Sequence, residues 1–578
     1  MKGWHMRDGI NSVFIITDWI AIGMIIGGLI ALPFTLDLLG YIILSGTAIF
    51  IIIGVSGGIF LIYRKSELKK NSIRRARSPS LKLIPLIIGI FGIVAIFTKQ
   101  YALTAHMGII LLGFLAGYTI TPRLHKKYQR LSRVIFGFAV FSVVAPFGFL
   151  VRGTLDPRSA SQVWTMHELD KPGFLLANGL DPADVNGDGY KDYLTNYEWD
   201  GALRVAFHPE LAQVKDPWHA ITIGGVANAE SSAFGDFDGD GNYDAVVAHG
   251  HEFSIQAGVF FIWGPAAENA TDAAAWERSK DIPGTINRGQ FLYIRGLELN
   301  GDGALDIVVG GRGVNPRAGL KWIEAPINPA DRRNVTQWQV HEIDATLESG
   351  HGFVFGDIDR DGDMDIALCN ADWNTAQSEE EITWFENPGT GTPAQRDPWP
   401  KHIIYKSADF YSKQQVTLYD LTGDTFLDII AQTDNDIYIW ENPQNPQTNN
   451  SWELTRIRKS KETCWQSRLI KIGDINNDTK PDLLGMLTHR NGALPTDKAA
   501  VFWMEYSGSD PKNANWTTHV IKWGEGFLGV GTFGEKWDQS EFEDVDRDGD
   551  LDIVANCEEC STLGFVYISV VWFENPLI

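Results

Sequence analysis

The distribution of apolar residues divides the chain into two parts near residue 152. Five apolar stretches precede this point, at residues 11–34, 38–63, 83–99, 101–120 and 134–151. Each is close to the roughly 20 helical residues that cross a hydrocarbon core. After this point the apolar runs are short and β-branched, as in Asp306-Ile-Val-Val, which is typical of strands. The pattern therefore predicts an α-helical transmembrane domain of about five spans at residues 1–152 and an all-β domain at residues 153–578.

The all-β part repeats itself about every sixty residues. Each unit has a short strand, an acidic loop, an apolar strand and a Trp-rich strand such as Ile382-Thr-Trp384-Phe-Glu-Asn-Pro388. A fourth strand follows the pattern Trp-x-x-His, as in Trp399-Pro-Lys-His402. Four short strands in each repeat, arranged radially, predict a β-propeller. Because the His residues recur at one place in an outer strand, we interpret them as structural.

The two ends of the array predict how the ring closes. A fourth-strand motif, Trp164-Thr-Met-His167, occurs before the first acidic loop, whereas only a Trp-rich strand at residues 571–576 follows the last. We therefore expect residues 160–170 to pair with the strand near residues 568–574, because that pairing leaves no open sheet edge. The sequence thus predicts a closed propeller of seven blades.

The acidic loops have the form Asp-x-Asp/Asn-x-Asp-Gly-x-x-Asp. We number them 1 to 7; they span residues 184–192, 236–244, 298–306, 357–365, 420–428, 474–482 and 544–552. Oxygen ligands at positions 1, 3, 5 and 9, with a carbonyl from position 7, suit Ca²⁺, and Gly at position 6 permits the sharp turn. The predicted metal ligands are Asp184, Asn186, Asp188, Asp192, Asp236, Asp238, Asp240, Asp244, Glu298, Asn300, Asp302, Asp306, Asp357, Asp359, Asp361, Asp365, Asp420, Thr422, Asp424, Asp428, Asp474, Asn476, Asp478, Asp482, Asp544, Asp546, Asp548 and Asp552.

Loops 5 and 6 are the weakest copies. Both lack Gly at position 6, and loop 5 has Thr422 in place of a carboxylate or amide. We expect reduced Ca²⁺ occupancy in these two loops. The alternative for any single loop is an Asp/Gly turn that holds no metal.

The acidic loops and the strands around them resemble the FG-GAP/VCBS repeat family, whose calcium loops recur in integrin-α-like propellers. The resemblance covers roughly residues 155–578 and implies a calcium-binding β-propeller. It does not imply one function, because the family includes adhesins, lectin-like modules and sugar-processing enzymes.

Charge predicts the orientation of the spans. Two basic segments, Arg64 to Lys82 and Arg123 to Arg133, lie between apolar stretches and are expected in the cytoplasm by the positive-inside rule. With five spans, the N-terminus is then cytoplasmic and the propeller extracytoplasmic, in a multi-pass cell membrane protein held in the lipid bilayer. The net charge is −23, with the acidic excess after residue 152, which argues against a nucleic acid partner.

The four cysteines lie in the all-β part. Cys557-Glu-Glu-Cys560 has the spacing of half a zinc site, a redox pair or a disulfide, and outside the cell a disulfide is favoured. A bridge between Cys464 and Cys557 is an alternative. Cys369 is the fourth.

A ligand is expected on the face opposite the acidic loops. That face is built from the loops before each first strand and those after each second strand, which vary in sequence and are polar. Such groups suit a glycan or a protein ligand. The predicted ligand-binding residues are His251, Arg312, His351, Asn370, Gln414, Arg468 and His489.

Three functions compete at this point. The first is a surface binding protein, or adhesin, held in the membrane. The second is a sugar-processing enzyme of the lyase or dehydratase type, in which His351, His251 or Arg312 acts as acid, base or charge stabiliser. The third is an outer cap subunit of a membrane complex with membrane-protein partners. Because no nucleophile–base pair stands out, we assign no catalytic residue and favour binding.

Overall fold

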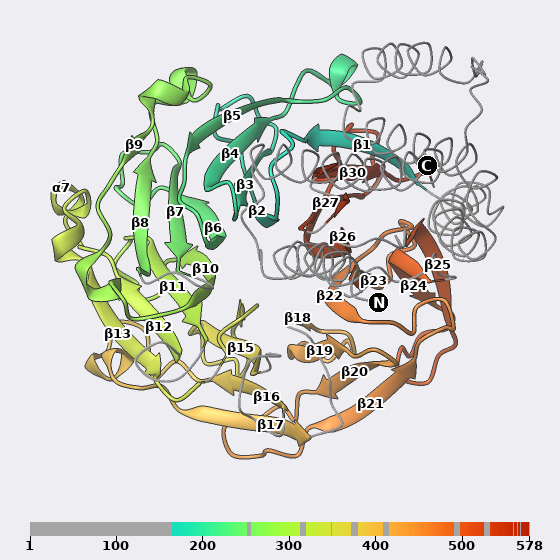
Figure 1. The fold of residues 1–578 in the computed structure, drawn as a ribbon. Helices are drawn as coiled ribbons and strands as arrows, with labels where there is room; N and C mark the ends of the chain where they lie inside the picture. The colour runs from blue at the N-terminus through green and yellow to red at the C-terminus, as the bar shows by residue number, and fades with distance from the viewer. Residues whose placement is uncertain are drawn as a thin grey trace, which may run out of the picture. The chain divides into compact units, whose positions relative to one another are not determined.

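The computed structural model describes eleven segments of the chain, all within one unit at residues 145–578. The described residues are 164–250, 256–312, 319–347, 349–370, 380–407, 415–490, 498–524, 532–558, 560–562, 565–566 and 568–576. They form an all-β fold whose sheets are arranged around a ring (Figure 1). The repeat predicted from the sequence is therefore present as a β-propeller.

Five separate four-stranded antiparallel sheets follow one another along the chain. The first has β2 (Ala177–Ala183), β3 (Asp192–Tyr197), β4 (Ala202–Phe207) and β5 (His219–Gly224). The second has β6 (Ala229–Gly235), β7 (Asp244–His249), β8 (Gly258–Trp263) and β9 (Glu277–Arg278). The third has β10 (Phe291–Leu297), β11 (Asp306–Gly311), β12 (Gly319–Glu324) and β13 (Gln339–Asp344).

The remaining strands complete the ring. The fourth sheet has β14 (Val354–Gly356), β15 (Asp365–Asn370), β16 (Glu380–Phe385) and β17 (Lys401–Ser407). The fifth has β18 (Val416–Tyr419), β19 (Asp428–Gln432), β20 (Asp436–Glu441) and β21 (Glu453–Arg458). A ten-stranded sheet has β22 (Ser467–Gly473), β23 (Asp482–Arg490), β24 (Ala499–Tyr506), β25 (Trp516–Trp523), β26 (Thr532–Glu543), β27 (Asp552–Cys557), β28 (Ser561–Thr562), β29 (Phe565–Val566), β30 (Val570–Glu574) and β1 (Thr165–Asp170).

Short helical turns occupy the connections, chiefly those between third and fourth strands. They are η3 (Leu211–Gln213), η4 (Ala267–Asn269), η5 (Ala273–Ala275), η6 (Pro283–Thr285), α7 (Pro329–Arg332), η7 (Val335–Gln337) and η8 (Pro393–Arg396). First strands such as β2, β6 and β10 lie toward the centre of the ring and fourth strands such as β13, β17 and β21 lie at its rim (Figure 1). The acidic loops consequently share one face, and the ends of the fourth strands share the other.

The hydrophobic core lies between successive sheets. Phe261 and Trp263 of the second sheet pack in one cluster with Ile307 of the third, and all are buried. Equivalent clusters occur at other junctions because the second and third strands of the sheets, such as β11 and β12, are buried on both faces. This double burial explains why the central strands read as continuous apolar runs.

The predicted closing strand is confirmed. β1 pairs antiparallel with β30, with Thr165 opposite Glu574 and His167 opposite Trp572. The backbone N–H of Trp164 also donates to the carbonyl of Ile521 in β25, at 3.1 Å. The strand that precedes the first acidic loop therefore completes the sheet that contains the last one.

The prediction of seven separate blades needs correction. β23 ends at Arg490, beyond Met486, its last pair with β24, and in this extension Thr488 lies opposite Lys536 of β26. This pairing joins the two last repeats into the ten-stranded sheet, so the described residues contain five four-stranded sheets and one larger, curled sheet. The residues that make the junction are polar, and no apolar alternation marks them as strand.

The predicted α-helical transmembrane domain is also corrected. In the described segments α7 is the one α-helix, with four residues, and no helix there is long and apolar enough to cross a membrane. The five apolar stretches lie outside the described residues. We therefore withdraw the prediction of a multi-pass cell membrane protein with a cytoplasmic N-terminus and an extracytoplasmic propeller, and with it the membrane partners.

The recurrent His residues are structural, as interpreted from the sequence. In the fourth sheet, the His402 ring stacks on Trp384 with ring centroids 4.3 Å apart, and its Nε2 lies 2.8 Å from Glu386 Oε2. The same Trp–Glu–His arrangement recurs three times, in Trp322, Glu324 and His341, in Trp503, Glu505 and His519, and in Trp572, Glu574 and His167. At these four places it fastens a fourth strand to the third strand beside it.

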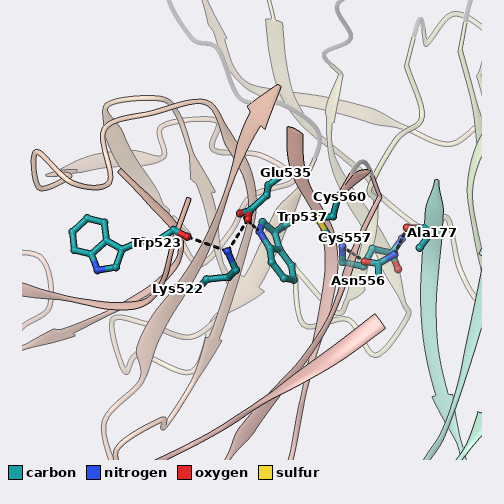
Figure 2. The surroundings of a disulfide bond; sticks show 9 residues. Ala177, Lys522, Trp523, Glu535, Trp537, Asn556, Cys557 and Cys560 are labelled. Atoms are coloured by element: carbon teal, nitrogen blue, oxygen red, sulfur yellow. Dashed lines mark hydrogen bonds and ion pairs between the residues drawn. A yellow bond between two sulfur atoms is a disulfide. The ribbon is translucent and has the colours of Figure 1, made fainter. Parts of the chain in front are cut away.

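Cys557 and Cys560 form a disulfide with their Cα atoms 5.5 Å apart (Figure 2). Beside it, Lys522 Nζ donates to Glu535 Oε1 at 2.6 Å, and Trp537 Nε1 donates to Glu535 Oε2 at 3.3 Å. Cys464 is a free thiol, so the alternative bridge between Cys464 and Cys557 does not form.

Candidate functional site

The acidic loops fold through hydrogen bonds from their own backbone amides. In loop 2, Gly241 N donates to Asp236 Oδ2 at 3.0 Å, Asp240 N to Asp238 Oδ1 at 3.0 Å, and Asn242 N to Asp240 Oδ1 at 2.9 Å. These bonds run from position 6 to position 1, from 5 to 3 and from 7 to 5. The chain therefore wraps around a point toward which its carboxylates turn.

Loops 5 and 6 adopt the same turn without Gly at position 6. Thr425 and Thr479 take its place at φ 77° and 70°, in the left-handed region. Their backbone amides still donate to Asp420 and Asp474, each at 2.8 Å. Because left-handed backbone costs a residue with a side chain roughly 1–2 kcal/mol, these two loops are strained but not rearranged.

The Asp at position 9 holds the loop onto the sheet. In loop 4, Asp365 Oδ2 accepts from Ile358 N at 2.9 Å, and Asp365 Oδ1 accepts from Asn387 N, after β16, at 2.8 Å. Burial raises the pKa of Asp365 to about 8, against the effect of these hydrogen bonds. The sequence predicted position 9 as a metal ligand, and the structure gives this residue a second role that joins the loop to the third strand.

Three loops bring carboxylates close enough to share a cation. Candidate ligand atoms lie within 4.8 Å of one another in loops 2, 4 and 7, in the groups Asp236, Asp238 and Asp244; Asp357, Asp359 and Asp361; and Asp544, Asp546 and Asp548. Among the described residues, Oδ1 atoms of Asp184, Asp357 and Asp544 are buried and lack a hydrogen-bond partner. Convergent, unpaired carboxylate oxygens fit a hard divalent cation such as Ca²⁺.

Side chains from the following sheet reach two of these loops. Arg333 Nε lies 2.6 Å from Asp238 Oδ2 in loop 2, and Lys215 Nζ lies 3.3 Å from Asp546 Oδ2 in loop 7. The Arg333 guanidinium neutralises part of the charge that a cation would balance in loop 2. Loop 4 is contacted instead by the uncharged Gln447, through Asp359.

The predicted ligand-binding residues on the opposite face are mostly engaged within the protein. His351 Nε2 lies 3.3 Å from Glu230 Oε1, Arg468 forms an ion pair with Asp538, and Asn370 Oδ1 accepts from Ser349 N at 3.0 Å. The structure thus pairs His351 and Arg468 each with a carboxylate outside the predicted set. It does not gather the set into one cluster.

Four more positions complete that set. Arg312 is buried and bridges to Ser349 through its backbone. His489 lies in β23 opposite Glu535 in the strand register. His251 and Gln414 lie outside the described residues.

A pocket that the sequence did not predict lies beside acidic loop 3. It has a volume of about 480 Å³ and is lined by polar side chains, including Asn300 and Asp302 of the loop, Arg396, and Gln339 of β13. Of the predicted ligand-binding residues whose side chains the structure describes, Arg312, His351, Asn370 and Arg468, none lines it. One signal was present in the sequence. The segment Trp322-Ile-Glu-Ala325-Pro, which lines this pocket, has Ala where Trp384-Phe-Glu-Asn387-Pro has Asn.

Comparisons with known proteins agree with the repeat. Residues 420–485, which contain acidic loops 5 and 6, match the FG-GAP-like repeat family. No curated protein matches the chain. A solved structure with a partial likeness is an Agrocybe aegerita lectin described as specifically recognising non-reducing terminal N-acetylglucosamine; it is 12% identical over 63% of this chain and 81% of the lectin chain, with a TM-score of 0.34. A likeness of this size does not bear on function.

Proposed function

We propose that the described residues form a calcium-binding β-propeller that binds a glycan or protein ligand. The observation that carries the calcium part is the convergence of three carboxylates in loops 2, 4 and 7, with buried Oδ1 atoms of Asp357 and Asp544 left without a hydrogen bond. Like charges this close repel one another, and a buried carboxylate without a partner is costly. A bound Ca²⁺ removes both penalties.

Calcium binding is tested on the whole chain. After treatment with EDTA and removal of the chelator, titration calorimetry with Ca²⁺ should give several bound ions, with Mg²⁺ binding more weakly because it demands stricter octahedral geometry. The melting temperature should fall in EDTA and return when Ca²⁺ is added, since a cation bound to the folded state stabilises it by mass action. An identical melting curve in EDTA and in Ca²⁺ would refute the proposal.

Two surfaces are candidates for the ligand. One is the opposite-face set His251, Arg312, His351, Asn370, Gln414, Arg468 and His489. The other is the pocket beside loop 3, which is favoured because polar groups such as those of Asp302 and Gln339 line an open volume there, while Arg396 and Asn300 donate to Glu324. Polar groups of this kind match the hydroxyls of a sugar or the backbone of a peptide.

A glycan array separates the two surfaces. The chain is applied in Ca²⁺ and in EDTA, together with Gln339→Trp, which fills the pocket, and Gln213→Ala, which changes an exposed residue of η3 elsewhere on the same face. If the pocket binds the glycan, Gln339→Trp abolishes binding and Gln213→Ala retains it. Binding that survives Gln339→Trp would place the ligand on another surface, with Arg312 the next position to substitute.

One observation favours the enzyme as a second candidate. His351 and Glu230 form a histidine–carboxylate pair whose side chains are 4% and 6% exposed. Such a pair is suited to general acid–base chemistry when a substrate reaches it. Turnover of polysaccharide by the wild type and its loss in His351→Gln, at unchanged melting temperature, would support the enzyme over the binding protein.

A further inference from the structure

Acidic loop 7 carries a carboxylate that the repeat does not require. Its position 7 is Asp550, whereas five other loops have Tyr190, Asn242, Ala304, Phe426 and Lys480 there. Loop 4 has Asp363 at the same place, half-buried. Position 7 was expected to offer only its backbone carbonyl to a cation, so the side chain of Asp550 is an additional group.

The Asp550 side chain is buried inside the loop without a partner. It is 2% exposed, and in the described structure neither of its carboxylate oxygens has a hydrogen-bond partner. The carboxylates of Asp548, Asp546 and Asp544 act on its charge, Asp548 most strongly, and these three form the close group of loop 7, which Asp550 adjoins. Burying a carboxylate without a hydrogen bond beside three others is unfavourable unless a cation joins them.

The basic side chains near loop 7 bind other groups than Asp550. Arg547 of the same loop turns away: its guanidinium donates to the carbonyl of Gly189 in loop 1 and lies over the Tyr190 ring at 4.1 Å. Lys215 lies 3.3 Å from Asp546 Oδ2 and 2.8 Å from Glu574 Oε1, and Asp546 Oδ1 remains buried without a hydrogen bond.

We propose that Asp550 is a further ligand of the divalent cation in acidic loop 7 and makes this loop the tightest calcium site of the ring. The assignment rests on the proposed calcium binding. Affinity of oxygen sites for Ca²⁺ rises with the number of charged ligands and with their rigidity, and the extra carboxylate of loop 7 is a buried one.

The site also adjoins the strand that closes the ring. Asp552 Oδ1 of loop 7 accepts from Asn575 N, directly after β30, at 2.8 Å. Glu574 at the end of β30 binds both Lys215 and His167 of β1. A cation in loop 7 therefore stabilises the part of the sheet where β1 pairs with β30.

The test compares Asp550→Asn with a matched control, Asp363→Asn, in the full chain. Calcium-free protein is titrated with Ca²⁺ by calorimetry, and melting is recorded in EDTA. We expect Asp550→Asn to weaken the tightest class of sites by about tenfold or more, and to melt above the wild type in EDTA because one buried repulsion is gone. Asp363→Asn should leave the tightest class unchanged.

The outcomes separate the two proposals. If the wild type binds no Ca²⁺, calcium binding itself fails and the Asp550 assignment fails with it. If the wild type binds Ca²⁺ but Asp550→Asn retains the tightest class, only the Asp550 assignment is overturned; equal weakening by Asp363→Asn overturns it too. Should the Asn variant not fold, Asp550→Ser removes the same charge with less bulk and is judged by the same two measurements.

Discussion

The two faces of the ring handle charge in opposite ways. On the acidic-loop face, carboxylates of one sign converge, and atoms such as Asp357 Oδ1 are left without a hydrogen bond. On the opposite face, buried charges lie beside partners of their own: Arg468 pairs with Asp538, and Lys459 Nζ donates to Gln432 Oε1 at 3.2 Å. We therefore propose that the acidic-loop face, unlike these two sites on the opposite face, gains from an external cation.

This difference separates two sources of stability in one repeat. Substitutions on the opposite face should act equally with and without calcium. Substitutions in the acidic loops should act through calcium. The four predictions below test that separation.

The largest effect is expected at the buried ion pair. Arg468→Met leaves Asp538 buried without its partner, which typically costs roughly 3–5 kcal/mol of unfolding free energy. Chemical denaturation should show the same loss in Ca²⁺ and in EDTA. The double variant Arg468→Met/Asp538→Leu is the control, because removing both charges restores much of the loss; a loss confined to EDTA would contradict the separation of the faces.

Lys459 gives the opposite face a dependence on pH. Burial lowers the pKa of Lys459 from 10.5 to about 7. The unfolded chain binds a proton between these values and the folded chain does not, so stability rises with pH there by roughly 1.4 kcal/mol per unit. Burial of Lys459 therefore costs no stability above pH 10.5, and its cost grows as the pH falls from 10.5 to about 7. Denaturation of Lys459→Met between pH 7 and 10 should lack this slope; a slope equal to the wild type's would show that another group titrates.

The acidic loops should differ among themselves in calcium. Asp361→Ala removes a carboxylate from the converging group of loop 4, and Asp424→Ala removes one from loop 5, which has Thr422 at position 3. In Ca²⁺, Asp361→Ala should lower the free energy of unfolding by up to about 2.7 kcal/mol, which is what a bound ion contributes at a concentration a hundredfold above its Kd. Asp424→Ala should lower it by less. Melting in EDTA is the control, where the difference should vanish. Equal losses in Ca²⁺ would mean that loops 4 and 5 are not distinguished by their ligands.

The smallest effect is expected at the rim, away from both faces. His402→Phe keeps the stacking on Trp384 but loses the hydrogen bond to Glu386, which is worth about 1 kcal/mol. The loss should be independent of calcium when measured by melting. His219→Phe is the matched control, because that exposed ring lies at 6.1 Å from Phe207 without such a carboxylate; an equal effect would assign the His402 contribution to the ring alone.

The sequence predicted those elements whose chemistry repeats. The acidic loops, the Trp and His strands and the pairing of residues 165–170 with β30 follow from motifs that recur in register. The union of the last two repeats does not, because Thr488, His489 and Arg490 of β23 become strand only through pairing with β26. Strand length there is set by tertiary contact and leaves no local signal.

The candidate site divides in the same way. Spacing alone identified the acidic positions, but it could not show that both Asp365 oxygens accept from backbone amides or that the Asp550 side chain is buried. The opposite-face residues were predicted because they are polar and lie in or next to the loops that build that face. Their burial against Glu230 and Asp538 depends on partners 121 and 70 residues away.

The pairing of β1 with β30 also imposes an order on folding. His167 and Glu574 are separated by 407 residues. At a synthesis rate of about 5–20 residues per second, β1 leaves the ribosome roughly 20–80 s before its partner exists. Bringing such distant strands together also costs about 5 kcal/mol of chain entropy. Throughout that interval the nascent chain carries an unpaired strand, so the closing contact is the last to form and the period before it is the one most exposed to misassociation.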